Sequence, residues 1–296
     1  MVKPNFFIVG APKCGTTAIN DYLAQHPDIF MAPKELHFFG LDLKVRTRIA
    51  ESEYLTFFES GVDKKVRGEA SVWYLFSKTA AQEIKVFSPD AKILIMLRNP
   101  VEVLYSLHSQ HLYDGNENVK DFEKAIGLDE QRKKGYHLPH SVDYFILPPY
   151  KESVLFADQV QRYFDVFGRE NVFVLLYDDF IRNLQGALTD LLLFLNVDTD
   201  FKIENKIINA NKKTRLFGLH LFLKRPPAIA RKAARFLFPS RDVRHRIMEK
   251  LFKFNIVTAK RKKMNEQLRL KLIDELKDEI ITLEKVINKD LSAWIK

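Results

Sequence analysis

The sequence predicts an α/β fold, in which a P-loop-containing parallel β-sheet is flanked by helices and followed by a basic helical C-terminal region. Short apolar runs alternate with segments of helical periodicity, as they do in parallel sheets with crossover helices. A glycine-containing loop separates the first run from the first helix, and 91–100 is a hydrophobic run typical of a central strand. We therefore expect one domain over 1–296, with an α/β core at 1–200 and a basic helical extension or lid at 201–296.

The individual elements follow from apolar runs, helical spacing and stop signals. Strands are expected at 5–10, 65–71, 91–100 and 171–180. Helices are expected at 16–27, 77–89, 101–114, 184–197 and 265–287. Asn99 and Pro100 suit the N-cap and the first position of the third helix. Ligands of such sheets bind beyond the carboxyl ends of the strands, so the polar clusters at Gly10, Arg98 and Tyr177 are expected at one edge.

Composition and charge narrow the class of protein. The 296 residues are 46% hydrophobic and 29% charged, enough to bury a substantial core. A single cysteine excludes an internal disulfide framework, and no apolar run has the features of a signal peptide or a membrane span, so a cytoplasmic location is expected. The net charge is +9, yet residues 212–263 alone contain 17 Lys/Arg and two acids. This block indicates an anionic partner or an anionic surface.

The segment GAPKCGTT at 10–17 has the features of a phosphate-binding loop. Its two glycines allow a tight turn, and a helix begins at Thr16, so several N–H groups and the positive helix end face one concavity. In the ATPase motif GxxxxGK[ST] a lysine stands where this chain has Thr16, and here the lysine of the loop is Lys13. The later strand ends in Arg-Asn at 98–99 rather than in a metal-binding aspartate. The loop therefore suits a ligand with a 5′-phosphate but no triphosphate, and no metal is expected.

At these residues the chain resembles a known family. GAPKCGTT is similar to the 5′-phosphosulfate loop of sulfotransferases that use 3′-phosphoadenosine 5′-phosphosulfate (PAPS). ILIMLRNPVEVLYSLHSQ at 93–110 resembles their 3′-phosphate motif, in which an arginine at a strand end precedes a helical serine; Arg98 and Ser106 match those positions. A guanidinium can bind a phosphate through two parallel hydrogen bonds, and the side chain of Ser106 leans toward the helix N-terminus, where anions are favoured.

The resemblance extends over residues 5–215 and is closest to heparan-sulfate-type and bacterial carbohydrate sulfotransferases. Further similar segments are PKELHFFG (33–40), RGEASVWYLF (67–76), LLYDDFIRNLQGAL (175–188) and NANKKTRL (209–216). The first resembles a Glu-x-His-Phe-Phe segment whose glutamate is taken as the catalytic base. This sequence departs from the heparan type in having Glu-Ala-Ser at 69–71, where Lys-Thr-Pro is frequent, and in lacking an N-terminal membrane anchor. We therefore expect a bacterial-style cytoplasmic enzyme.

The resemblance implies a PAPS-dependent sulfotransferase that acts on a hydroxyl or an amine, with a carbohydrate or a glycolipid as acceptor. Lys13 is expected to stabilise the leaving phosphate, and Glu35 to act as general base, with His37 as the alternative base or as a donor to the sulfuryl oxygens. Glu69 is expected to bind the acceptor or to support Lys13. The residues expected to hold the nucleotide are Lys13, Cys14, Gly15, Thr16, Thr17, Arg98, Ser106, Lys212, Lys213 and Arg215.

Two other classes of function are alternatives. A P-loop kinase would require a lysine at 16 and a metal-binding aspartate after a strand, and the sequence has neither. A module that binds a membrane surface or an anionic polymer would use 212–263, where apolar and basic residues interleave. No zinc-finger, RNA-recognition or helix-turn-helix signature supports nucleic acid as a partner. The identity of the base, the oligomeric state, and the choice between a lid and a dimer contact for the C-terminal helices are left open by the sequence.

Overall fold

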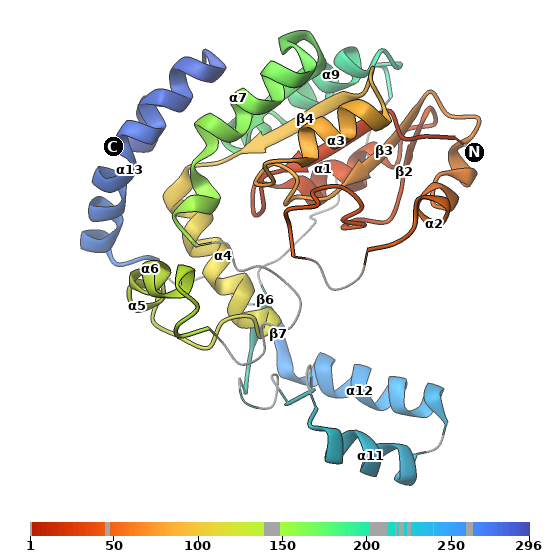
Figure 1. The fold of residues 1–296 in the computed structure, drawn as a ribbon, viewed down its shortest axis with the longest axis vertical. Coiled ribbons are helices and arrows are strands. Elements are labelled where there is room, and N and C mark those ends of the chain that lie inside the picture. Colours follow the sequence, from red (N-terminus) through yellow and green to blue (C-terminus); the bar gives the residue numbers. More distant parts are fainter. Residues whose placement is uncertain are drawn as a thin grey trace.

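A computed structural model of the chain describes residues 2–44, 48–138, 149–201, 212–216, 218, 222–223, 226–238, 240–258 and 263–296. Five strands form one sheet in the order β2-β3-β1-β4-β5, and every neighbouring pair is parallel (Figure 1). The strands are β1 (Phe6–Gly10), β2 (Ile29–Met31), β3 (Val66–Ala70), β4 (Lys92–Leu97) and β5 (Val172–Leu176). The predicted α/β fold with a parallel sheet is confirmed.

Strand β1 lies at the centre of the sheet, between β3 and β4. All five of its residues are buried, and Ile8 is paired with Ala70 on one side and with Leu94 on the other. The register with β4 shifts between Ile8 and Gly10, where the chain leaves the ladder. Because neighbouring parallel strands end at the same edge, the loop that follows β1 is flanked by the carboxyl ends of β3 and β4.

Helices cover both faces of this sheet. Those of the first two thirds are α1 (Thr16–Leu23), α2 (Glu51–Thr56), α3 (Ala80–Phe87), α4 (Pro100–Asp114), α5 (Phe122–Gly127), α6 (Asp129–Lys133), α7 (Phe156–Phe167), α8 (Tyr177–Arg182) and α9 (Leu184–Leu195), with 3₁₀ turns η1 (Glu59–Gly61), η2 (Glu152–Val154) and η3 (Arg169–Asn171). Helices α3 and α7 pack together on one face, and α1 and α8 on the other, where the rings of Tyr22 and Phe180 lie 6.3 Å apart. As predicted, Asn99 is the N-cap of α4, and its side chain accepts the Val101 N–H at 3.0 Å.

The predicted strand at 171–180 is wrong in its second half. The strand ends at Leu176, and α8 begins at Tyr177. Asp178 and Asp179 lie in the first turn of α8, where the helix dipole favours carboxylates over an extended conformation. Sequence reasoning also missed β2 and α7. Strand β2 has three residues, which are too few to show a period. The apolar residues of α7 have helical spacing, but no helix was predicted from it.

The expected C-terminal extension at 201–296 has two parts of different character. Helix α13 (Glu266–Ile287) packs against α7 and α4, and with η4 (Ser292–Ile295) it adds buried side chains to the core, namely Leu272, Ile273, Leu276, Ile280, Leu283, Ile287 and Trp294. The expected boundary at residue 200 would therefore place α13 outside the core, although α13 packs into that core. The other part, the excursion at 215–255, contains α11 (Ala228–Leu237) and α12 (Arg241–Asn255), which project from the rest of the described chain in Figure 1. Residues 202–211 lie outside the described residues.

In the part of the chain that the structure describes, no helix is both long enough and apolar enough to cross a bilayer.

Candidate active site

The loop between β1 and α1 ends in a helix N-terminus that carries no side-chain cap. Gly15 is the N-cap of α1 with φ 93°, and the first turn holds no acidic residue. The first N–H groups of a helix have no partner inside it and carry the positive end of the helix dipole. A Cβ on Gly15 would lie 3.0 Å from Cδ2 of Tyr177, so both the φ angle and the close approach require glycine. This end of α1 fits a phosphate group.

Lys13 is held in the same loop by a contact with α4. Its backbone is in the left-handed region, with φ 66°, and its Nζ donates to Oε1 of Gln110 at 3.0 Å. Gln110 Nε2 donates in turn to Oδ2 of Asp114 at 2.7 Å. Sequence reasoning missed Gln110, because its contact with Lys13 depends on where α4 runs and not on any local pattern.

The second cation of the site, Arg98, follows directly after β4. Its guanidinium carbon lies 4.7 Å from the centroid of the Tyr177 ring, and Nη2 lies 3.8 Å from Oε2 of Glu102. The Tyr177 ring thus contacts both Arg98 and the Gly15 turn, and it fixes the loop and the arginine relative to one another. Ser106 lies further along α4 and is buried.

Lys13 and Arg98 act electrostatically on the same point, the thiol of Cys14. Burial raises the pKa of Cys14 to about 12, and the positive charges of Arg98 and Lys13 only partly oppose that rise. The thiol is therefore protonated and fills space inside the loop, while the Cys14 amide donates to the Ala11 carbonyl at 3.4 Å. One cation thus belongs to the loop and the other to the end of β4, and both lie near Cys14.

Glu35 and His37 lie close together at the end of β3. The Glu35 amide donates to the Ala70 carbonyl at 2.8 Å, and Nε2 of His37 lies 3.2 Å from Oε2 of Glu35. Burial raises the pKa of Glu35 to about 7, against the opposing charge of Lys34. Burial, followed by the charge of Arg48, lowers the pKa of His37 to about 4. Near neutral pH the imidazole is therefore uncharged, and with its proton on Nε2 it donates to the carboxylate.

Both residues have left-handed backbones, with φ 62° at Glu35 and 49° at His37. Such conformations cost free energy for residues other than glycine and collect at functional sites. The turn is held in place by the Ser71 hydroxyl, which accepts the His37 N–H at 3.2 Å. The guanidinium of Arg48 donates to the carbonyl oxygens of His37, Phe38, Phe39, Gly40 and Leu43. Lys13 has the same kind of backbone, so all three residues predicted to be catalytic lie in this strained conformation.

Glu69 lies beneath this turn and is fully buried. Its Oε1 accepts hydrogen bonds from Ser71 at 2.8 Å and from Tyr74 at 2.7 Å, and its Oε2 accepts one from Tyr54 at 2.5 Å. Burial raises the pKa of Glu69. This arrangement differs from the expected contact with the acceptor or with the loop lysine, because both oxygens bind core hydroxyls. Through Ser71, Glu69 supports the turn that carries Glu35.

Lys34 is a further cation at the site that the sequence prediction did not assign. Its Nζ donates to Oγ1 of Thr17 at 2.6 Å, in the first turn of α1. Burial lowers the pKa of Lys34, and the charge of Glu35 opposes that shift. Lys34 therefore lies between the helix end and the Glu35 turn. The only sequence signal was its place beside Glu35 in PKELHFFG.

The late basic segment is less clearly tied to this site. Lys212 and Lys213 belong to β6 (Lys212–Thr214), and their side chains lie outside what the structure describes. The Arg215 guanidinium lies 5.3 Å from the centroid of the Phe254 ring, toward the end of α12. Contacts of these three residues with a nucleotide stay predictions.

Comparison with known proteins gives three findings. A family model described as "Sulfotransferase domain" matches residues 3–225. Mouse carbohydrate sulfotransferase 15 is 28% identical over 248 residues (66% of this chain and 44% of that protein), and human heparan sulfate glucosamine 3-O-sulfotransferase 6 is 32% identical over 109 residues (37% and 31%). The crystal structure of a sulfotransferase from Alicyclobacillus acidocaldarius superposes with a TM-score of 0.75 at 32% identity, covering 100% of both chains. The chain spans less than half the length of these curated relatives.

Proposed function

The chain belongs to the sulfotransferase domain family, and from this premise we propose that it transfers a sulfuryl group from PAPS to a hydroxyl or amine of a carbohydrate acceptor. One observation carries the proposal: the parts that such a reaction needs lie at the carboxyl ends of three adjacent strands. The loop with Lys13 follows β1, Arg98 follows β4, and Glu35 is hydrogen-bonded to the last residue of β3.

Binding of the donor uses the helix end and the two cations around the loop. PAPS supplies a sulfuryl group whose bond to the 5′-phosphate oxygen breaks as the acceptor atom bonds to sulfur, and the nucleotide leaves with that electron pair. The N-terminus of α1, with Thr16 and Thr17, binds the 5′-phosphate. Lys13 moves from Gln110 to stabilise the charge that develops on the leaving oxygen. Arg98 and Ser106 bind the 3′-phosphate.

The proton of the acceptor goes to Glu35 in this proposal. A general base is most effective when its pKa lies near the working pH, and the Glu35 pKa of about 7 meets that condition whereas the His37 pKa of about 4 does not. We assign His37 to positioning, because its Nε2 lies 3.2 Å from the Glu35 carboxylate. Lys34, bonded to Thr17, can neutralise a sulfuryl oxygen on the acceptor side.

The acceptor class is taken from the relatives, which are a carbohydrate sulfotransferase and a heparan sulfate glucosamine sulfotransferase. A sugar hydroxyl or amine, on a saccharide or a glycolipid, is the acceptor that we propose. The predicted cytoplasmic location stays a prediction, whereas the family match does not support the P-loop kinase alternative.

Calorimetry with 3′-phosphoadenosine 5′-phosphate (PAP) beside ATP with magnesium tests the donor assignment. We expect PAP to bind, and ATP with magnesium to bind at least about tenfold more weakly, because the loop has Thr16 where a triphosphate site has lysine. Arg98→Ala is expected to lower PAP affinity about 100-fold, since two charge-assisted hydrogen bonds are lost.

Arg182→Ala is the matched control, because the Arg182 guanidinium pairs with Asp179 at the surface, 2.9 Å away. It is expected to leave PAP binding unchanged. Tighter binding of ATP with magnesium than of PAP would instead contradict the donor assignment.

A further inference from the structure

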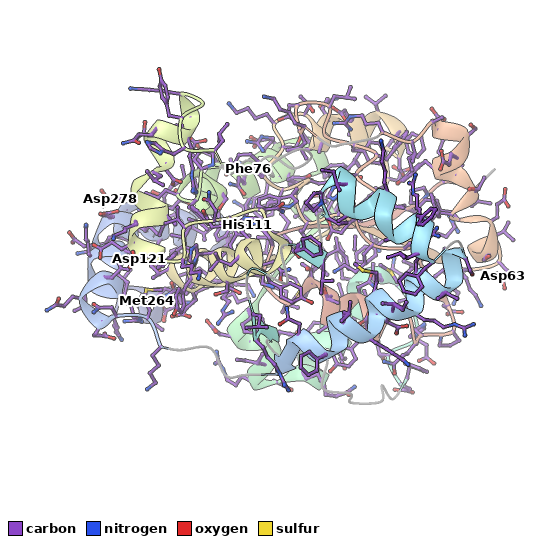
Figure 2. All side chains as sticks on the ribbon, turned by 90° about the horizontal axis from the view of Figure 1, so that it is seen from below. Asp63, Phe76, His111, Asp121, Met264 and Asp278 are labelled. Carbon is purple, nitrogen blue, oxygen red and sulfur yellow. The ribbon has the colours of Figure 1, made fainter. Side chains whose placement is uncertain are left out.

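The excursion at 215–255 leaves and rejoins the core through a short antiparallel ribbon. Strand β6 pairs with β7 (Ile256–Thr258), with Thr214 opposite Ile256. Asn255 closes the base: its Oδ1 accepts the Leu216 N–H at 2.8 Å and its Nδ2 donates to the Leu216 carbonyl at 3.1 Å. Helices α11 and α12 lie side by side in the views of Figure 1 and Figure 2, and Figure 1 shows them beyond this ribbon, away from the sheet.

Helix α11 is amphipathic, and its apolar residues are exposed. At helical spacing Ile229, Phe236 and Leu237 fall on one arc, Lys232 borders that arc, and Arg235 lies on the far side of the helix. The exposed fraction is 82% for Ile229, 86% for Phe236 and 67% for Leu237. Large apolar side chains in such contiguous exposure mark an interaction surface.

Helix α12 also exposes apolar side chains, and its exposed cations lie beside them rather than on an opposite arc. Val243, Leu251 and Phe254 share one arc and are exposed, Phe254 by 62%. Arg246 and Lys250 are exposed as well. The two helices together thus offer apolar side chains and cations on the same projecting element.

The charge of the excursion is strongly one-sided. Residues 228–255 contain eight Lys/Arg and only two acids, Asp242 and Glu249. The wider block at 212–263 has a balance of +15, which leaves the remainder of the chain at −6 against a total of +9. A net negative body with a positive projecting element directs the excursion toward an anionic surface.

From this combination we propose that α11 and α12 dock the protein on the surface of an anionic lipid bilayer. The apolar arcs enter the boundary between headgroups and acyl chains, and the cations meet the anionic headgroups. An anionic polymer would satisfy the cations but leave Ile229, Phe236 and Phe254 in water, so a bilayer matches both features. Docking needs neither nucleotide nor acceptor, and it is therefore independent of the proposed function.

Co-sedimentation of the full chain with lipid vesicles tests the proposal. The probes are vesicles of phosphatidylcholine alone and vesicles in which about one third of the lipid is phosphatidylglycerol. We expect binding to the second at least about tenfold stronger than to the first, and a marked loss of binding as salt rises from about 0.1 M to about 0.5 M.

Two double variants separate the apolar and the charged contributions. Ile229→Ser/Phe236→Ser and Lys232→Glu/Arg235→Glu are each expected to weaken binding to the anionic vesicles about tenfold or more. The apolar control is Val86→Ser/Leu193→Ser, at side chains that are 74% and 59% exposed on α3 and α9. The charge control is Lys277→Glu/Lys285→Glu on α13, which changes the net charge by the same amount.

Both controls are expected to bind like the wild type, and thermal unfolding checks that all four variants fold. The proposal is overturned if the wild type does not bind anionic vesicles more strongly than neutral ones, or if a control variant loses as much binding as its test variant. Binding that survives Ile229→Ser/Phe236→Ser would be purely electrostatic, which also overturns it. A wild-type dimer that this variant dissociates, without vesicle binding, would identify the surface as a contact between copies of the chain.

Discussion

The carboxyl edge of the sheet and the α11–α12 excursion both present positive charge, but they hold it differently. At the sheet edge each cation has a fixed partner: Lys13 bonds to Gln110, Lys34 bonds to Thr17, and Arg98 lies over Tyr177. On the two helices, cations such as Lys232 and Arg246 are exposed. Cations that are already oriented lose little side-chain entropy on binding and can select one phosphate geometry. Exposed cations attract any anionic surface, and salt screens that attraction.

The largest effect on kcat is expected from Glu35, which lies at the sheet edge and is not a cation. Glu35→Gln should lower kcat about 10³-fold, because an amide cannot take the proton of the acceptor. Turnover is measured with PAPS and an acceptor found in a panel of sugars, with PAP affinity as the control for folding. Wild-type turnover in this variant would remove Glu35 from the role of base.

Next in size are the fixed cations of the loop. Lys13→Ala should lower kcat about 10²-fold, through lost stabilisation of the leaving oxygen, and Lys34→Ala should lower it about tenfold. Lys277→Ala, at an exposed site on α13, serves as the control and should change nothing. An equal loss in Lys34→Ala and Lys13→Ala would contradict the proposed division of roles between them.

The support beneath the site can be tested through stability. Tyr54→Phe should lower the free energy of unfolding by about 2 kcal/mol, because one oxygen of the buried Glu69 carboxyl loses its hydrogen bond. Tyr136→Phe, at a side chain that is 66% exposed, should have no effect. Urea denaturation of both variants measures the difference; similar values for the two would show that the hydroxyl is not needed.

The pH dependence should report the state of Glu35. The general base must be ionised, so kcat should rise with pH through an inflection near the Glu35 pKa of about 7 and level off above it. In His37→Ala the inflection should move to higher pH, because the carboxylate loses a donor that favours its charged form. An unchanged inflection, measured by kcat across the neutral range, would argue against the positioning role of His37.

The smallest effect is expected when a variant of the α11–α12 excursion is tested for nucleotide binding at the sheet edge. Lys232→Glu/Arg235→Glu is expected to change PAP affinity by less than about twofold at physiological salt, since both residues belong to α11, which projects away from the sheet in Figure 1. Calorimetry beside Arg98→Ala gives the comparison. A loss like that of Arg98→Ala would mean that the two cationic regions act as one site.

The sequence predicted the elements whose signals are local. The apolar runs of β1 and β4 and the Asn99-Pro100 start of α4 needed only neighbouring residues. The strand at 171–180 was extended too far because Tyr177 and Phe180 favour strands, while the aspartates between them favour a helix start.

The parts that the sequence did not predict depend on contacts between distant residues. The bond from Lys13 to Gln110 and the three hydroxyls around Glu69 exist only once α4, β3 and the Tyr54 helix are packed. The sequence predicted a helix at 265–287, but it could not indicate that this helix, α13, packs against α7 and α4.

The pairing of Thr214 with Ile256 has a consequence for how such a chain can change. Because the entry and exit of the excursion are neighbours, a tight turn could replace everything between them and leave the path of the remaining chain intact. An ancestral chain could therefore acquire, lose or exchange the excursion as one unit, while the residues at the sheet edge kept their positions.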